Sequence, residues 1–164
     1  MDEAEGLAKA EFAFPGPLRD RLLEAILVGD KTATASLRIE YAPSTAEPLP
    51  QTGRRAVVVD SADRPVAVIE TTAVAVVRFG DVGTDFAHAE GEGFASVDDW
   101  RRGHLRFWES DELRTAIGKP DFRVTDDTLV VAERFRLVEI LDQAAAAMSR
   151  RNRAPSNVTL STPR

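Results

Sequence analysis

Residues 29–37, GDKTATASL, combine a helix-ending signal, a lysine and three hydroxyl side chains. Gly29 can adopt the left-handed backbone conformation that ends a helix. From residue 32 to residue 39, polar and apolar residues alternate, which predicts a half-buried strand. The polar side chains of this strand share one face, and they are Thr32, Thr34, Ser36 and Arg38. Such a face beside Lys31 suits a polar ligand, but from this stretch alone we favour an ordinary solvated edge strand, in which threonine serves its β-propensity.

The composition predicts one globular domain without covalent cross-links. The chain has 164 residues, of which 43% are hydrophobic and 29% are charged. It contains no cysteine, which excludes disulfides and thiolate chemistry and fits the cytoplasm, the location that we predict. There is no long apolar run, so we expect no membrane span. With only two histidines, His88 and His104, a histidine-rich zinc site is not expected.

The charge distribution argues against non-specific binding of long nucleic acids. The net charge is −6, and residues 148–164 contain four arginines and no acidic residue, which leaves −10 on the remainder. Phosphate contacts supply most of the affinity for long nucleic acids, and an acidic body opposes them. A small nucleoside, or a short RNA bound by a local basic patch, remains compatible with this charge.

Hydrophobic periodicity predicts an α+β fold with helices between strands. We expect a helix ending near Val28, a strand at 32–39, a loop at 42–53, and further strands at 54–60, 65–79, 122–124 and 128–141. A short helix is expected at 85–89 and a longer one from 96 to about 117. We divide the chain into an N-terminal extension (1–11), a domain (12–145) and a disordered tail (146–164). The order lacks βαβ alternation and suits a small, partly closed barrel of mixed sheet.

Four ionisable residues outside the first stretch are candidates for a site. Glu90 and Glu92 are each followed by a glycine, so the backbone there can bend and present a carboxylate. Glu70 shares a strand face with valines, where a carboxylate is paired, at an edge or functional. His104 follows Trp100 by one helical turn, which favours a buried, hydrogen-bonded histidine over a catalytic one. The same spacing predicts that Trp100 and Phe107 are buried and His104 at least half-buried.

Three stretches together carry a family resemblance. They are GDKTATASL at 29–37, VIETT at 68–72, and FGDVGTDFAHAEGEG at 79–93 followed by SVDDWRRGHLRFW at 96–108, and the closing VVAERFRLVEIL fits as well. The chain resembles the ASCH domain family, in its longer bacterial branch, over about residues 12–141. This resemblance implies a PUA-like fold, a mixed β-barrel of about five or six strands with flanking helices and a cleft beside the barrel.

The resemblance also implies a function and a catalytic set. The family is thought to bind RNA or modified nucleosides, and some small bacterial members are amidohydrolases that deacetylate N4-acetylcytidine. Their catalytic residues are a Lys, a Thr three positions later and a Glu before the next helix. These match Lys31 and Thr34, with Glu92 favoured by spacing and Glu90 as the alternative.

One departure from the family pattern concerns substrate contacts. The small enzymes have an Arg two residues after the catalytic Thr, whereas this chain has Ser36 there and Arg38 two residues further. We therefore assign substrate binding to a broader set, which is Thr32, Ser36, Arg38, Glu70 and His104. We predict no metal site and no cofactor, because amide hydrolysis by these groups requires neither.

The sequence leaves the roles of these residues open. A deprotonated Lys31 would act as a base toward the Thr34 hydroxyl, whereas a charged Lys31 beside Glu92 would stabilise developing negative charge. The alternatives are a non-catalytic RNA- or nucleotide-binding module and a metal-independent ribonuclease. The expected partner is RNA or a modified nucleoside and not a membrane, and the oligomeric state stays open. A lysine lining a cleft contributes little to stability, so the Lys31→Ala variant is expected to melt near the wild-type temperature.

Overall fold

The computed structural model describes residues 4–41 and 47–142, and it contains five strands and four α-helices in these ranges. The predicted tail at 146–164 and part of the 42–53 loop lie outside the described residues. In chain order the elements are β1 (Ala8–Ala10), α1 (Pro17–Val28), β2 (Ala33–Leu37), β3 (Arg55–Val59), β4 (Pro65–Arg78), α2 (Thr84–Ala89), α3 (Val97–Trp108), α4 (Asp111–Ile117) and β5 (Leu129–Ile140). Single 3₁₀ turns follow β2 and β4, at Arg38–Glu40 and Phe79–Asp81.

The five strands form one sheet in the order β1-β3-β4-β5-β2. β1 runs parallel to β3, and the other neighbouring pairs are antiparallel. The predicted α+β class is therefore confirmed, but the sheet is open and not closed into a barrel, with β1 and β2 as its edges. At the start of the β2 edge, the Thr32 N–H donates to the Ala89 carbonyl at the end of α2, so α2 adjoins this edge.

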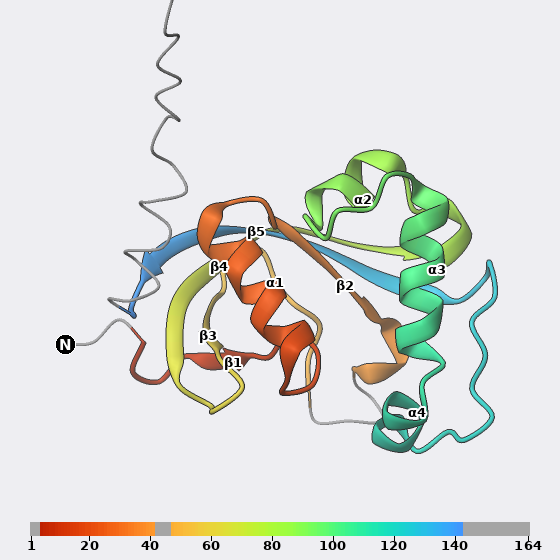
Figure 1. Ribbon diagram of the computed structural model, residues 1–164, viewed down its shortest axis with the longest axis horizontal. Helices are drawn as coiled ribbons and strands as arrows, with labels where there is room; N and C mark the ends of the chain where they lie inside the picture. The colour runs from red at the N-terminus through yellow and green to blue at the C-terminus, as the bar shows by residue number, and fades with distance from the viewer. Residues whose placement is uncertain (1–3, 42–46, 143–164) are drawn as a thin grey trace, which may run out of the picture.

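In Figure 1, α1 lies by one half of the long β4–β5 ribbon, and α2 and α3 lie by the other half. Phe135 and Val130 lie five residues apart on β5, so their side chains point to opposite faces. Phe135 belongs to a core formed with α1, whereas Val130 belongs to a core formed with α2, α3 and α4. At the start of β2, Ala33 belongs to the second core, whereas Lys31 lies over Phe12 of the first core.

The α1 helix follows the expected pattern closely. Pro17 lies in its first turn, where the missing N–H costs nothing, and Gly29 ends it with a positive φ of 90°. Its apolar residues Leu23 and Ile26 are buried against the sheet. Arg19 is also buried, and its guanidinium donates to backbone carbonyls that include that of Phe12.

The helical segment at 96–117 differs from the prediction because it is two helices. Ser96 caps α3 by accepting a hydrogen bond from the Asp99 N–H at 3.1 Å. Ser110 caps α4 by accepting from the Leu113 N–H at 3.2 Å, so a second helix starts where one continuous helix was expected.

Two further expectations are also corrected. Residues 122–124 are not a strand, because side chains bind their backbone: Glu109 accepts from the Val124 N–H, and Arg114 donates to the Phe122 carbonyl. Phe107 is only partly buried, against Phe14, at a ring-centroid distance of 5.8 Å.

The N-terminal residues 8–10 pair with β3, and the sequence had not indicated this strand. Trp100 is fully buried, as predicted. Among the described residues, no helix has the length and apolar character needed to cross a bilayer.

Candidate functional site

A tight corner between α1 and β2 sets the position of Lys31. The backbone N–H groups of Asp30 and Lys31 both donate to the Ala25 carbonyl, at 2.9 and 3.0 Å. The strand then begins at Ala33, so Lys31 belongs to the corner and not to the strand ladder. Its side chain is only 2% exposed, which makes it a buried cation.

Three groups surround the buried Lys31 ammonium. Its Nζ donates to the Glu90 backbone carbonyl at 3.1 Å and lies 3.6 Å from Glu92 Oε2. The aromatic ring of Phe12 lies 5.9 Å away, measured to its centroid, in a cation–π arrangement. A buried charge requires such partners, because desolvation without them is expensive. Lys31 is therefore anchored to the loop that carries both glutamates.

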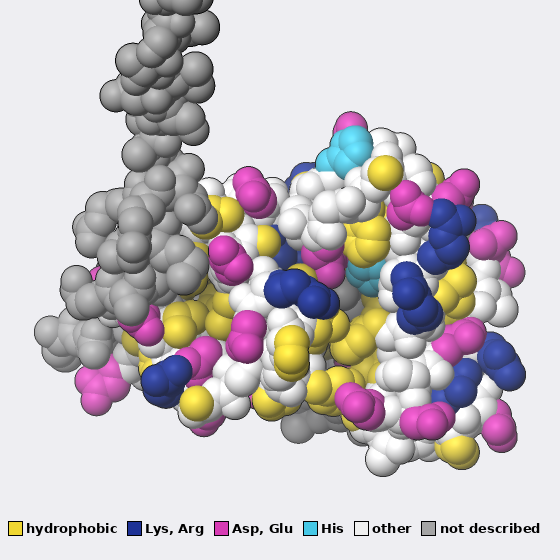
Figure 2. Space-filling view, in the orientation of Figure 1, with side chains coloured by type: hydrophobic (Ala, Val, Ile, Leu, Met, Phe, Trp, Pro, Cys, Tyr) yellow, Lys and Arg dark blue, Asp and Glu magenta, His cyan; other side chains and the backbone are white. Residues whose placement is uncertain are grey.

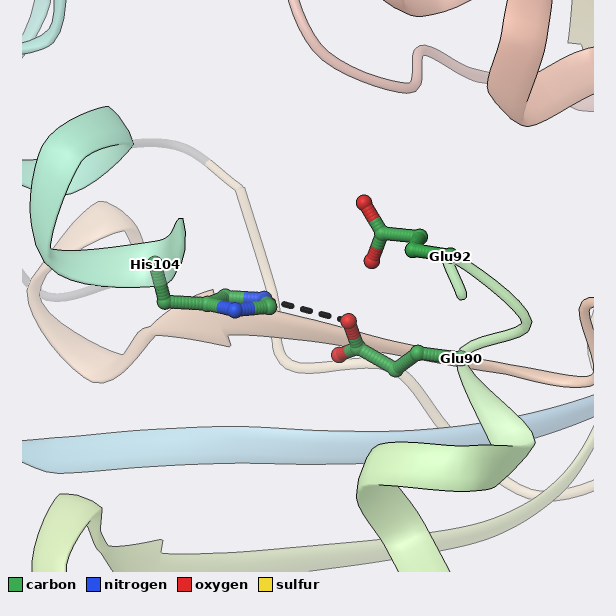
Figure 3. A group of neighbouring side chains, drawn as sticks. All are labelled: Glu90, Glu92 and His104. Carbon is green, nitrogen blue, oxygen red and sulfur yellow. Dashed lines mark ion pairs between the residues drawn. The ribbon is translucent and has the colours of Figure 1, made fainter. Parts of the chain in front are cut away.

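The loop at 90–93, EGEG, can approach the corner only because residue 91 is a glycine. Gly91 has a φ of 65°, and a Cβ built on it would lie 2.2 Å from the Asp30 carbonyl oxygen. No side chain fits at that distance. The backbone contact brings Glu90 and Glu92 to the α1–β2 corner, and their carboxyl groups lie near each other (Figure 3).

His104, on α3, is a hydrogen-bonded partner of Glu90. Its Nε2 lies 3.1 Å from Glu90 Oε2, and its Nδ1 lies 2.9 Å from the Trp100 carbonyl oxygen. Both neighbours are acceptors, so both ring nitrogens carry hydrogen and the imidazole is a cation. Burial acts to lower the pKa of His104, but the hydrogen bond and charge of Glu90 outweigh it and raise the pKa. Stacking on Trp100, with ring centroids 4.0 Å apart, holds the ring in place.

The pKa values of the two glutamates in the loop are shifted in opposite directions. Burial acts to raise the pKa of Glu90, but hydrogen bonding and charge from His104, with help from Lys31, lower it to about 2. Glu92 is raised to a pKa of about 7, first by burial and then by its hydrogen bond to the ionised Glu90. Glu92 is also the more accessible of the two, with 19% of its side chain exposed against 1% for Glu90. The loop thus offers one permanent anion and one carboxyl that exchanges protons near neutral pH.

The contacts within the cluster do not favour a metal ion. Glu90, Glu92 and His104 each offer one ligand atom, and these atoms lie within 4.8 Å of one another. However, Glu90 Oε2 and His104 Nε2 already bind each other, and the Lys31 ammonium supplies the positive charge beside Glu92. We therefore assign no metal site to the cluster.

A second polar group lies on the strand face that continues from this corner. Thr34 pairs with Glu133 on β5, so the two side chains share a face. The Thr71 hydroxyl donates to Glu133 Oε1 at 2.7 Å, and Ser36 Oγ lies 2.6 Å from the Tyr41 hydroxyl. Sequence reasoning missed Glu133 and Tyr41, although Glu133 interrupts the apolar alternation of its strand.

The structure brings together some of the predicted site residues and separates others. Lys31, Glu90, Glu92 and His104 form one cluster, and Thr34 and Ser36 follow Lys31 along β2 on the face of Glu133. No hydrogen bond joins the Thr34 hydroxyl to Lys31 among the described residues. The remaining three predicted residues lie apart from the cluster contacts, as described next.

Thr32 is exposed, and its hydroxyl donates to the Ala89 carbonyl at 3.3 Å. Arg38 lies beyond the far end of β2 from Lys31. Glu70 is engaged in ion pairs with Arg55 and Arg136 on the neighbouring strands, both at 3.1 Å.

Acidic and histidine side chains are visible in a hollow of the molecular surface between α1 and α3 (Figure 2). A separate cavity of about 250 Å³ lies between β4, β5 and α2, with a largely apolar wall that includes Phe86 and Arg134. None of the predicted site residues lines that cavity.

Comparisons with known proteins agree with this architecture. A family model described as the ASCH domain matches residues 11–139, and the chain belongs to this family, which is associated with RNA binding. Two solved structures are similar. The ASCH domain from Lactobacillus crispatus JV V101 has 29% identity and a TM-score of 0.67, over 80% of each chain. Protein EF3133 from Enterococcus faecalis V583 has 28% identity and a TM-score of 0.63, over 84% of this chain and 74% of that one. No match was found among curated proteins.

The similarity to these solved structures also defines the fold class of the chain. ASCH structures have a PUA-like fold, and the open five-stranded sheet with its helices is this chain's version of it. Two expectations stay predictions: that the chain belongs to the longer bacterial branch of this family, and that it has a catalytic activity.

Proposed function

We propose that this protein binds a modified nucleoside, free or within a short RNA, and hydrolyses the acyl amide of an N4-acylated cytidine. The observation that supports it is the contact between Lys31 and Glu92, in which a buried cation adjoins a partly exposed carboxyl that titrates near neutral pH. General acid–base catalysis is most effective when the catalytic pKa lies near the working pH.

The proposed reaction uses Glu92 twice. Ionised Glu92 accepts a proton from the attacking hydroxyl, which belongs to water or to Thr34, while the new C–O bond forms at the acyl carbon. The positive charge of Lys31 stabilises the negative charge that develops on the carbonyl oxygen. Glu92 then returns the proton to N4 as the C–N bond breaks, which releases cytidine. When Thr34 attacks, a water molecule hydrolyses the resulting ester by the same proton transfers.

Glu90 and His104 are positioning residues in this proposal. Their mutual ion pair keeps Glu90 ionised, and the ionised Glu90 in turn helps to keep the pKa of Glu92 near 7. The Glu90 backbone carbonyl also fixes the Lys31 ammonium. Neither side chain needs to touch the substrate.

The test is incubation of the full chain with a panel of N4-acylated cytidines and short RNAs, with the products read by mass spectrometry. Release of the acyl group is expected, and Glu92→Gln should reduce its kcat by about 100-fold or more. Glu139→Gln is the matched control, because Glu139 is exposed on β5 away from the loop. Turnover by Glu92→Gln at the wild-type rate contradicts the mechanism. Cleavage of the RNA would indicate the ribonuclease, and binding without turnover the non-catalytic module.

A further inference from the structure

Glu133 is a half-buried carboxylate that the proposed hydrolysis does not use. It lies in the middle of β5, and Thr71 holds one of its oxygens through a hydrogen bond of 2.7 Å. Among the residues that the structure describes, its other oxygen accepts no hydrogen bond and no cation forms an ion pair with it. A strand interior rarely holds a half-buried carboxylate with an unused oxygen. Its environment therefore suits a ligand that brings its own donors.

Further hydroxyl side chains lie on the strand that pairs with Glu133. Thr34 on β2 pairs with Glu133 on β5, so the two side chains share a face of the sheet. Ser36 lies two residues after Thr34 on β2, and its Oγ is 2.6 Å from the Tyr41 hydroxyl. Burial raises the pKa of Tyr41 to about 12, and the negative charge of Glu133 is one of the smaller contributions in the same direction. Tyr41 therefore keeps its proton at all physiological pH values and lies close enough to Glu133 to sense its charge.

Glu133 also lies on the same side of the sheet as the Lys31 cluster. Phe135, two residues further along β5, points to the same face and contacts the Phe12 ring, with centroids 5.8 Å apart. The Lys31 ammonium lies over that Phe12 ring. Thr34, the partner of Glu133, is three residues from Lys31, which is about 10 Å of extended chain. A single nucleoside has this length scale, so one molecule can reach both groups.

We propose that Glu133 accepts hydrogen bonds from the 2′- and 3′-hydroxyls of a ribose whose base lies toward Lys31 and Glu92. This inference rests on the proposed function, because it assumes that the ligand is a nucleoside. A carboxylate without a neighbouring cation repels a phosphate, whereas it is a good acceptor for a diol. The 2′-hydroxyl is the group that distinguishes RNA from DNA, so Glu133 would make the site selective for ribonucleosides.

Calorimetric titration with cytidine, 2′-deoxycytidine and 3′-deoxycytidine tests the proposal on the full chain without requiring turnover. The wild type is expected to bind cytidine about 10-fold more tightly than either deoxy analogue, and Glu133→Gln should remove this preference. The control Glu139→Gln, on an exposed position of the same strand, should keep it. Thr71→Val retains the carboxylate but releases its anchored oxygen, and it should show a reduced preference.

Equal affinity of the wild type for cytidine and 2′-deoxycytidine would overturn the proposal, and so would the absence of binding by all three. Retention of the full preference by Glu133→Gln would do the same. If Glu133→Gln does not fold, an unreduced preference in Thr71→Val overturns it. A preference for ribose without any hydrolysis would refute only the amidohydrolase activity, whereas deacylation with equal KM values for ribo- and deoxyribonucleosides would refute only the role of Glu133.

Discussion

Replacing Glu90 with Gln tests how the carboxyl of Glu92 becomes a neutral-pH acid. The pKa of Glu92 rises from 4.5 to about 7, which corresponds to about 3 kcal/mol in favour of its protonated form at about 1.4 kcal/mol per pH unit. Burial is the largest cause, and the ionised Glu90 contributes through a hydrogen bond and through charge repulsion. In Glu90→Gln the Lys31 ammonium loses this competing anion, so the pKa of Glu92 is expected to fall by one pH unit or more. At pH 6 the residue would change from about 90% protonated to at least half ionised.

The assay is ¹³C NMR of the glutamate side-chain carboxyl carbons, followed from pH 3 to pH 9 in the wild type and in Glu90→Gln. The Glu92 resonance is assigned by its disappearance in Glu92→Gln, and Glu139→Gln is the control that should leave its midpoint unchanged. Glu90→Gln also removes the counterion of His104, so its imidazole is expected to lose its proton at lower pH. The loss of a buried ion-pair partner should reduce the free energy of unfolding by about 3 kcal/mol. A Glu92 midpoint that stays near 7 in Glu90→Gln would refute the reasoning and leave burial as the only cause.

Three further predictions concern the same corner. Gly91→Ala should lower the melting temperature and abolish deacylation, because its Cβ would lie 2.2 Å from the Asp30 carbonyl oxygen. Gly53→Ala is the control for backbone strain alone, since Gly53 has a φ of 84° and open space around it, and equal effects of the two substitutions would contradict the close approach. Lys31→Ala should lose about 3–5 kcal/mol of stability in urea denaturation, because its side chain is buried beside Glu92, whereas the sequence analysis expected a lysine that lines a cleft and contributes little to stability. Wild-type stability of this variant would show that the ion pair is unimportant. Finally, Glu92 keeps its proton up to about pH 7 in the folded protein but only to about pH 4.5 in the unfolded chain, so the free energy of unfolding of the wild type should fall by up to about 3 kcal/mol between these pH values. Urea titrations at pH 4.5, 5.5, 6.5 and 7.5 measure this decrease, and Glu92→Gln should lack the part of it that comes from Glu92.

Local sequence was sufficient for several parts of the candidate site. The helix that ends at Gly29 and the alternation that follows it predict the α1–β2 corner, because both depend on the conformations that a few neighbouring residues prefer. Lys31 stands between Gly29 and the start of the predicted strand, and it lies in this corner. The motifs at 29–37, 68–72 and 79–108 together also predicted the family, which the match over residues 11–139 shows.

Tertiary structure alone decided the electrostatics of the cluster. Glu90 and Glu92 are two residues apart and look equivalent in the sequence, yet the pKa of one falls to about 2 and that of the other rises to about 7. The difference arises because His104, brought by α3, binds Glu90 and not Glu92. A pKa depends on burial and on charges in space, and these partners lie 14 and 59 residues away along the chain.

Strand pairing decided the remainder of the site and the shape of the sheet. Glu133 faces Thr34 and Thr71 only because β5 pairs with β2 and β4 in one register, and a slip of one residue would turn its side chain to the other face. The sequence predicted the α+β class and four of the five strands, β2 to β5, because the residue pattern of each of these segments favours a strand locally. It could not predict that β1 joins at one edge and that the sheet stays open, since pairing between distant strands depends on long-range contacts that no local pattern encodes.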